Sequence, residues 1–193
     1  MAHDDSTLER GSDPQLTRRG LLVLGAATLT GLSAVPSQAL ALAAKPRSIS
    51  LINLHTKEEF AGIFWSGGRL RANALERLNH VLRDHRTDEV YPIAPNLLDV
   101  LHDLHARLST DEPFHVVSGY RSPKTNARLR KKSKGVARKS FHMRGMAIDI
   151  RVPGVDTASL TKAARAMRAG GVGYYRKSGF IHLDIGPVRN WNG

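Results

Sequence analysis

The sequence Ser140-Phe-His142-Met-Arg-Gly145-Met-Ala147-Ile-Asp149, with Phe180-Ile-His182-Leu-Asp184 near the C-terminus, decides how this chain is interpreted. The two stretches supply two histidines and one aspartate: His142, Asp149 and His182. Two neutral imidazoles and one carboxylate suit Zn²⁺, and three protein ligands leave a fourth position for water. An open position is typical of a catalytic zinc, so we expect a metallohydrolase.

The spacing of these residues determines which backbone conformation can bring their side chains together. Side chains alternate between faces along a strand, so His182 and Asp184 share one face. His142 and Asp149 would lie on opposite faces of one straight strand. Gly145 can adopt the backbone angles that bend the chain and return His142 towards Asp149. Spacing alone leaves open that the histidines are surface or capping residues, although Asp149 in an apolar strand needs a partner.

Hydrophobic periodicity predicts an α+β fold, in which a small antiparallel sheet carries the zinc site and packs against helices. Strands are predicted over residues 48–54, 58–65, 114–117, 146–152, 172–175 and 180–185. Helices are predicted over residues 75–82, 97–108, 124–132 and 160–167. Pro92 and Pro95 mark the start of the second helix.

Residues 1–44 are typical of an export signal and not of a folded segment. The pair Arg18-Arg19 precedes a mild apolar run, as in twin-arginine signals, and residues 39–43 fit a small-x-small cleavage site. We expect cleavage there, and one domain over residues 45–193. The twin-arginine machinery would then export a protein without a stable membrane anchor to the periplasm. An ordinary secretory signal or an uncleaved anchor remains an alternative.

Charge and cysteine content fit this location. Residues 1–43 hold three of the 29 Lys and Arg and four of the 17 Asp and Glu, so the remaining residues carry a formal charge of +13. Such a field favours polyanions. Outside the inner membrane these are cell-wall carboxylates and lipid headgroups. The chain has no cysteine, which excludes both disulfides and lipoprotein attachment.

Much of the basic charge is concentrated between the two halves of the candidate site. The tract consists of Arg128, Arg130, Lys131, Lys132, Lys134, Arg138 and Lys139. Such a run is most simply a solvated face. It could instead form a rim that gathers stem-peptide carboxylates, in which case binding should weaken as salt rises.

Several motifs together resemble a known family. They are Ser118-Gly119-Tyr120-Arg121-Ser122-Pro123-x-x-Asn126, Ser140-x-His142-x-x-Gly145-x-Ala147-x-Asp149, Gly170-Gly171-Val172-Gly173-Tyr174-Tyr175 and His182-x-Asp184-x-Gly186-Pro187. The combination is similar to the murein endopeptidase MepK (YcbK-like) group of the D-Ala-D-Ala carboxypeptidase/lysostaphin/hedgehog-type zinc peptidases. The likeness extends from about Arg47 to Trp191. It implies a zinc endopeptidase that cuts peptide cross-links in peptidoglycan.

The resemblance also assigns roles to residues. It implies His142, Asp149 and His182 as zinc ligands, and Arg121 as the arginine that binds substrate and stabilises the developing oxyanion. Ser140 and Asn126 are expected to contribute to substrate binding.

The general base is less clear, because several relatives carry a glutamate at the position that Gly179 occupies here. Asp184 is then the first candidate for the catalytic base. The alternative, that Asp184 orients a ligand histidine, is equally supported. His115 is a weaker candidate.

Other functions stay open at this point. Without the glutamate, the chain could be a non-catalytic zinc-containing protein that binds peptidoglycan. It could also be a D-alanyl carboxypeptidase that trims terminal D-alanine. Charge alone would suggest nucleic acid, but we find no recognition motif and expect no such partner. We expect a monomer, and the residues do not determine whether a D,D or an L,D cross-link is cut. Trp65 and Trp191 are explained most simply by core packing.

Overall fold

The computed structural model describes residues 45–133 and 135–193. The predicted export signal and Lys134 therefore lie outside the described residues. The elements, in chain order, are β1 (Arg47–Asn53), β2 (Glu59–Ser66), β3 (Arg69–Leu70), α2 (Ala72–Val81), α3 (Pro95–Leu108), β4 (Phe114–Ser118), α4 (Pro123–Lys132), the 3-10 turn η1 (Phe141–Arg144), β5 (Ala147–Arg151), α5 (Thr157–Met167), β6 (Gly171–Tyr175), β7 (Phe180–Asp184) and β8 (Arg189–Asn192).

The predicted α+β class is confirmed, and the sheet is larger than predicted. Eight strands form one sheet in the order β3-β2-β1-β4-β5-β7-β6-β8. Most neighbours are antiparallel, but β1 with β4 and β6 with β8 pair in parallel. The sequence analysis missed β3 and β8, because two or four residues are too few to show an apolar period.

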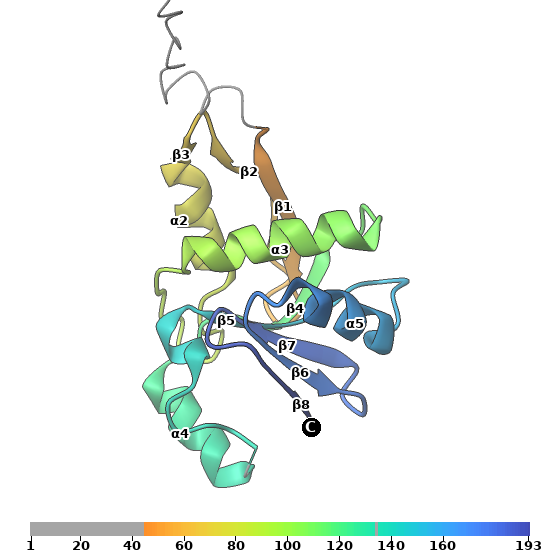
Figure 1. The fold of residues 1–193 in the computed structure, drawn as a ribbon. Coiled ribbons are helices and arrows are strands. Elements are labelled where there is room, and N and C mark those ends of the chain that lie inside the picture. The colour runs from red at the N-terminus through yellow and green to blue at the C-terminus, as the bar shows by residue number, and fades with distance from the viewer. Residues whose placement is uncertain (1–44, 134) are drawn as a thin grey trace, which may run out of the picture. The chain divides into compact units, whose positions relative to one another are not determined.

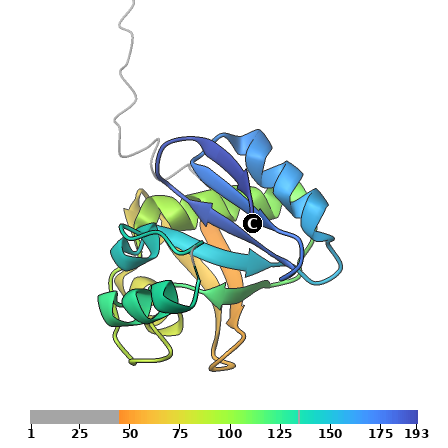
Figure 2. The ribbon, with the colours of Figure 1, turned by 90° about the horizontal axis from the view of Figure 1, so that it is seen from below.

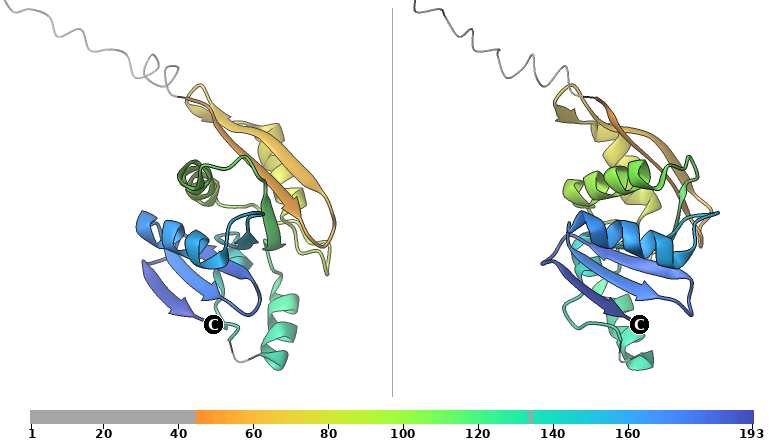
Figure 3. Two further views of the ribbon diagram at one scale, coloured as in Figure 1. Left: turned by 90° about the vertical axis from the view of Figure 1, so that its right-hand side faces the viewer. Right: turned by 45° about the vertical axis from the view of Figure 1, so that its right-hand side comes forward.

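The core lies on one face of this sheet. Large side chains from alternate strand positions pack there against α2, α3 and α5, and the largest wholly buried ones from the strands are Leu51, Phe60, Phe64, Phe114, Ile148 and Ile150. α3 crosses this face. α5 lies beside α3 and packs over β6 and β7 (Figures 1 and 3). Residues of the intervening positions therefore point to the opposite face. That face is free to carry polar side chains.

Residues 121–133 and 135–146 contribute no side chain to this core cluster. This part of the chain contains α4 and η1. α4 extends away from the sheet in Figure 1 and lies to one side of it when seen from below (Figure 2). Proline at the first position starts both α3 and α4, and Ser122 Oγ caps α4 by accepting a hydrogen bond from the Thr125 backbone N–H. In the described part of the chain, no helix combines the length and the apolar character that crossing a membrane requires.

Candidate metal centre

The candidate metal centre begins with a row of residues that crosses five neighbouring strands. Asp149 of β5 lies opposite His182 of β7, and His182 lies opposite Gly173 of β6. Ser118 of β4 and Trp191 of β8 complete the row at its two ends. Paired positions present their side chains on the same face. The sheet therefore places Asp149 and His182 side by side, on the face opposite the core.

His142 reaches this face from the turn η1 and not from a strand. Ser140 Oγ accepts a hydrogen bond from the His142 backbone N–H at 3.4 Å where the turn begins, and Gly145 ends it with φ of 63°. A Cβ atom at Gly145 would overlap the carbonyl oxygen of Pro92. The predicted bend at Gly145 is confirmed, and it places the buried His142 side chain next to Asp149.

Alanine at position 145 is expected to destabilise the protein more than alanine at position 154. Both glycines have positive φ, but a Cβ atom at Gly154 would meet open space, whereas one at Gly145 would meet backbone atoms. The left-handed conformation costs about 1–2 kcal/mol for either alanine, and overlap with Pro92 adds about 1–3 kcal/mol. Thermal unfolding of Gly145→Ala and Gly154→Ala measures the difference. Equal losses of Tm would show that the Pro92 contact has no consequence.

Three donor atoms converge at the centre of the site. His142 Nε2 and His182 Nδ1 are 3.2 Å apart, and they lie 3.2 Å and 2.9 Å from Asp149 Oδ1. Ligands bound at 2.0–2.1 Å to a tetrahedral Zn²⁺ lie about 3.3 Å from one another. The triangle therefore has the size that such an ion needs.

Hydrogen bonds on the far side of each ring determine which nitrogen carries the proton. His142 Nδ1 donates to the Gly119 carbonyl at 2.8 Å, and His182 Nε2 donates to Asp184 Oδ2 at 2.9 Å. When both imidazoles are neutral, as metal ligands are, each has one N–H, so both rings turn a lone pair towards Asp149. Three acceptors in contact repel one another unless a cation lies among them. The residues present thus fit a metal ion.

The electrostatics of the site point the same way. Burial lowers the pKa of His182, but hydrogen bonds to Asp149 and Asp184 outweigh it and raise the pKa to about 9. Burial raises the pKa of Asp149, yet His142 and His182 hold it well below its usual range. For His142, burial prevails over Asp149 and lowers the pKa. The two carboxylates therefore favour positive charge at His182 Nδ1, where a bound metal ion would take the place of the second ring proton. His142 stays neutral, as a ligand must be.

Asp184 is fully occupied by hydrogen-bond donors. Its side chain has no solvent exposure, and Arg189 binds both oxygens, with Nη1 at 3.0 Å from Oδ1 and Nη2 at 2.7 Å from Oδ2. Gly171 N–H and Gly186 N–H also donate to Oδ1, and His182 donates to Oδ2. This arrangement favours the orienting role for Asp184 over the role of general base. Nothing in the sequence analysis had singled out Arg189.

Removing Arg189 is expected to weaken metal binding without removing a ligand. Arg189→Ala removes one donor from each oxygen of Asp184 and leaves Oδ2 bound to His182 alone, so Asp184 orients His182 less firmly. Loss of such outer partners typically lowers metal affinity by about 10- to 100-fold. Competition with a chromogenic chelator measures the affinity. Arg176→Ala, at an exposed arginine of the β6–β7 turn, is the control. Wild-type affinity in Arg189→Ala would contradict the orienting role.

Arg121 lies beside the three donors. Its Nη2 is 3.5 Å from Asp149 Oδ2 and 3.4 Å from Ser118 Oγ, and its backbone N–H donates to the His142 carbonyl. The side chain is largely buried, yet Nε has no hydrogen-bond partner among the described residues. A guanidinium with a free donor next to the centre suits a carboxylate or an oxyanion.

The other two residues expected at the substrate site have different surroundings. Ser140 is buried and caps η1. Asn126 is buried, and its Nδ2 donates to the Ala137 carbonyl at 3.1 Å, which ties α4 to the loop after it. These contacts favour a positioning role for both residues over direct contact with substrate.

The remaining neighbours of the centre come from β6 and β8. The Trp191 ring lies 5.2 Å from the His182 ring and crosses Gly173, where a Cβ atom would meet it at 2.5 Å. Trp191 is thus a half-exposed wall of the site and not a core residue. His115 lies opposite Arg151 in the β4–β5 pairing, and Gly179 lies at the β6–β7 turn. Neither supplies a base next to the donors.

The chain is similar in sequence to proteins of known family over most of its length. The sequence model of the family described as "Peptidoglycan L,D-endopeptidase MepK" matches residues 41–191. The protein of that name from Escherichia coli K12 is 44% identical over 176 residues, which cover 90% of this chain and 96% of the relative. "Probable peptidoglycan L,D-endopeptidase MepK" from Haemophilus influenzae is 39% identical over 179 residues, with 91% and 96% covered.

Proposed function

Because this chain belongs to the peptidoglycan L,D-endopeptidase MepK family, we propose that it is a zinc-dependent murein endopeptidase that hydrolyses L,D peptide cross-links during cell-wall remodelling. The observation that carries the proposal is the convergence of three lone pairs on one point beside a buried arginine. Family membership supplies the substrate class and narrows the open choice between D,D and L,D cross-links.

We infer that His142 Nε2, Asp149 Oδ1 and His182 Nδ1 hold the zinc ion. When bound, Zn²⁺ polarises a substrate carbonyl and lowers the pKa of water towards about 7. The chain's own groups prepare this chemistry. The Gly119 carbonyl and Asp184 hold the two imidazoles in the tautomers that bind metal.

Arg121 is assigned to the oxygen on which charge develops during attack on the cross-link. Its position 3.5 Å from Asp149 Oδ2 places a permanent positive charge beside the donors. Preorganised charge of this kind stabilises an oxyanion more than the ground-state carbonyl. Trp191 of β8 lies on the other side of His182, with its ring 5.2 Å from the imidazole.

Digestion of purified sacculi tests the proposed function. The endopeptidase is expected to convert L,D-linked muropeptide dimers into monomers, and a chelator should stop the reaction. A carboxypeptidase would instead release D-alanine and leave the dimers intact. A protein that only binds the wall would release no fragments. Intact L,D dimers after incubation with the metal-loaded protein would contradict the proposal.

We further propose that residues 1–44 form a twin-arginine export signal and that the domain works in the periplasm. Arg18-Arg19 and the small residues before Lys45 support this, as does a family match that begins at residue 41. Replacing both arginines by lysine is expected to abolish export, because this pathway reads the arginine pair and not its charge alone. Cell fractionation measures the distribution. Normal periplasmic levels of the double variant would favour an ordinary secretory signal.

A further inference from the structure

A run of positive charge links the two halves of the metal centre. Between Pro113 and Ile148 the chain has ten Lys and Arg and no Asp or Glu. We define the basic arm as residues 123–133 and 135–139, that is, α4 and the described part of the loop after it. Its exposed basic side chains are Lys124, Arg128, Arg130, Lys131, Lys132, Arg138 and Lys139.

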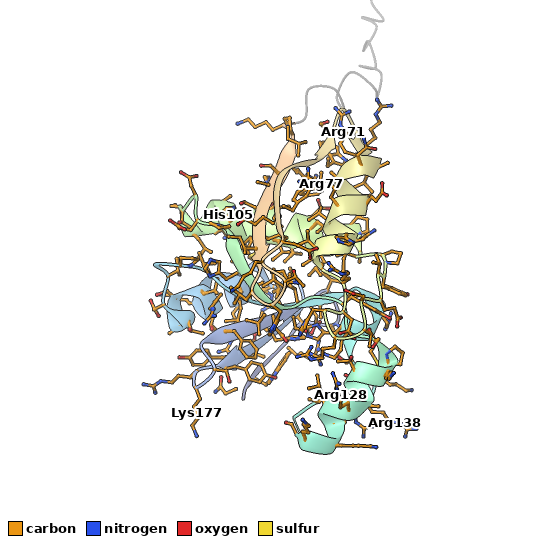
Figure 4. All side chains as sticks on the ribbon, turned by 180° about the vertical axis from the view of Figure 1, so that it is seen from behind. Arg71, Arg77, His105, Arg128, Arg138 and Lys177 are labelled. Carbon is orange, nitrogen blue, oxygen red and sulfur yellow. The ribbon has the colours of Figure 1, made fainter. Side chains whose placement is uncertain are left out.

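The cations of the basic arm have no partner of opposite charge within the described part of the chain. None of the ion pairs among the described residues includes a side chain of the basic arm. Arg128 and Arg138 extend from α4 and its loop on the side of the molecule away from Lys177 (Figure 4). Protein surfaces usually mix charges of both signs. An arm of one sign repels itself and attracts anions.

The basic arm is nevertheless held in place by buried polar contacts. Asp84, only 1% exposed, accepts hydrogen bonds from Ser122 N–H at 2.9 Å and Ser122 Oγ at 2.7 Å. Asn126 connects the start of α4 to Ala137 in the loop. These contacts fix the arm at its base. The exposed cations are therefore presented from an ordered element.

Both ends of the basic arm lead into the metal centre. Before the arm, Arg121 N–H donates to the His142 carbonyl; after it, the chain enters η1 and His142 itself. Arg121 precedes the N-cap of α4 and lies 3.5 Å from Asp149, so one guanidinium connects the base of the arm with the donors.

We propose that the basic arm is a docking surface for the polyanionic peptidoglycan strand, binding its stem-peptide carboxylates and leading one cross-link to the metal centre. This inference rests on the proposed function, because that function supplies the polymer. Charge complementarity identifies the occupant, and the position of Arg121 gives it a direction. An anionic membrane fits less well. The large apolar side chain of α4 is Leu129, half-buried, so the helix has no apolar face to insert into lipid.

Co-sedimentation with sacculi tests the docking surface. The arm variant carries Arg128→Gln, Arg130→Gln, Lys131→Gln and Lys132→Gln, which preserve helix propensity. The control variant carries Lys45→Gln, Arg69→Gln, Arg107→Gln and Lys162→Gln, an equal change of charge at exposed sites outside the arm. Full-length metal-loaded proteins are mixed with sacculi on ice. Bound protein and released fragments are measured in the same samples.

The arm variant is expected to bind sacculi about ten-fold more weakly than wild type at low salt, since each exposed ion pair contributes a fraction of a kcal/mol. The control variant should bind as wild type does. Sacculi whose carboxylates have been converted to amides should no longer distinguish the two proteins. On these sacculi, wild type and the arm variant are expected to bind equally weakly. If no fragments are released, the proposed function is contradicted but the docking surface is not, because bound protein is measured separately from released fragments.

Three results would overturn the docking surface. The first is wild-type binding by the arm variant. The second is an equal loss in the control variant, which would show an effect of net charge and not of the arm. The third is loss of binding to phosphatidylglycerol vesicles with unchanged binding to sacculi, which would identify a membrane as the partner.

Discussion

His142→Ala is expected to abolish both metal retention and cleavage of cross-linked muropeptides. His142 is 2% exposed, and its Nε2 is one of only three donor atoms that converge in this cluster of described residues. Removing a direct ligand should lower affinity well beyond the roughly 10- to 100-fold loss seen for outer partners. Metal content of the purified protein and digestion of L,D dimers measure the two effects.

Two controls make the result on His142 interpretable. His80→Ala removes an exposed histidine that pairs with Glu58, and it should retain metal and activity. We expect His142→Ala to fold, because Gly145 and the other residues of the η1 turn are unchanged. Thermal unfolding checks this expectation. A folded His142→Ala protein that still cuts cross-linked muropeptides would show that the reaction does not depend on this metal centre.

Arg121→Ala is expected to keep the metal and lose turnover. The guanidinium contacts Asp149 Oδ2 at 3.5 Å but is not one of the three converging donors. Loss of one group that stabilises an oxyanion typically lowers kcat by about 10²- to 10³-fold. Arg121→Lys keeps the charge but not the planar fork, so it should recover only part of the rate.

Steady-state kinetics on a soluble L,D dimer, with metal analysis of the same samples, measure this effect. A fall in kcat at full metal content supports the assigned role. Loss of metal in step with activity would instead show that Arg121 holds Asp149 in place. Wild-type kcat in Arg121→Ala would remove the arginine from the mechanism.

The local geometry of the metal centre could be predicted from the sequence to a large extent. His182 and Asp184 follow the period of a strand, and they do lie on one face, joined by a 2.9 Å hydrogen bond. The bend between His142 and Asp149 was predicted from Gly145, whose φ is 63°. Both inferences concern residues close together in the sequence. Backbone geometry limits such short segments strongly.

The parts that could not be predicted depend on contacts between distant segments. Arg189 reaches Asp184 because β8 pairs in parallel with β6, and four mostly polar residues give no periodic signal for such a strand. Asp84 is preceded by Arg83 and followed by His85 and Arg86, a pattern typical of a surface, yet it is buried under Ser122. Its burial depends on Ser122, the N-cap of α4, which is 38 residues further along the chain.

The most direct test of the metal centre is an anomalous diffraction measurement on crystals of the purified protein, on both sides of the zinc absorption edge. One strong anomalous peak is expected above the edge, at about 2.0–2.2 Å from His142 Nε2, Asp149 Oδ1 and His182 Nδ1. The peak should vanish below the edge. A peak at another place, or the three side chains closing on one another without a metal, would contradict the account.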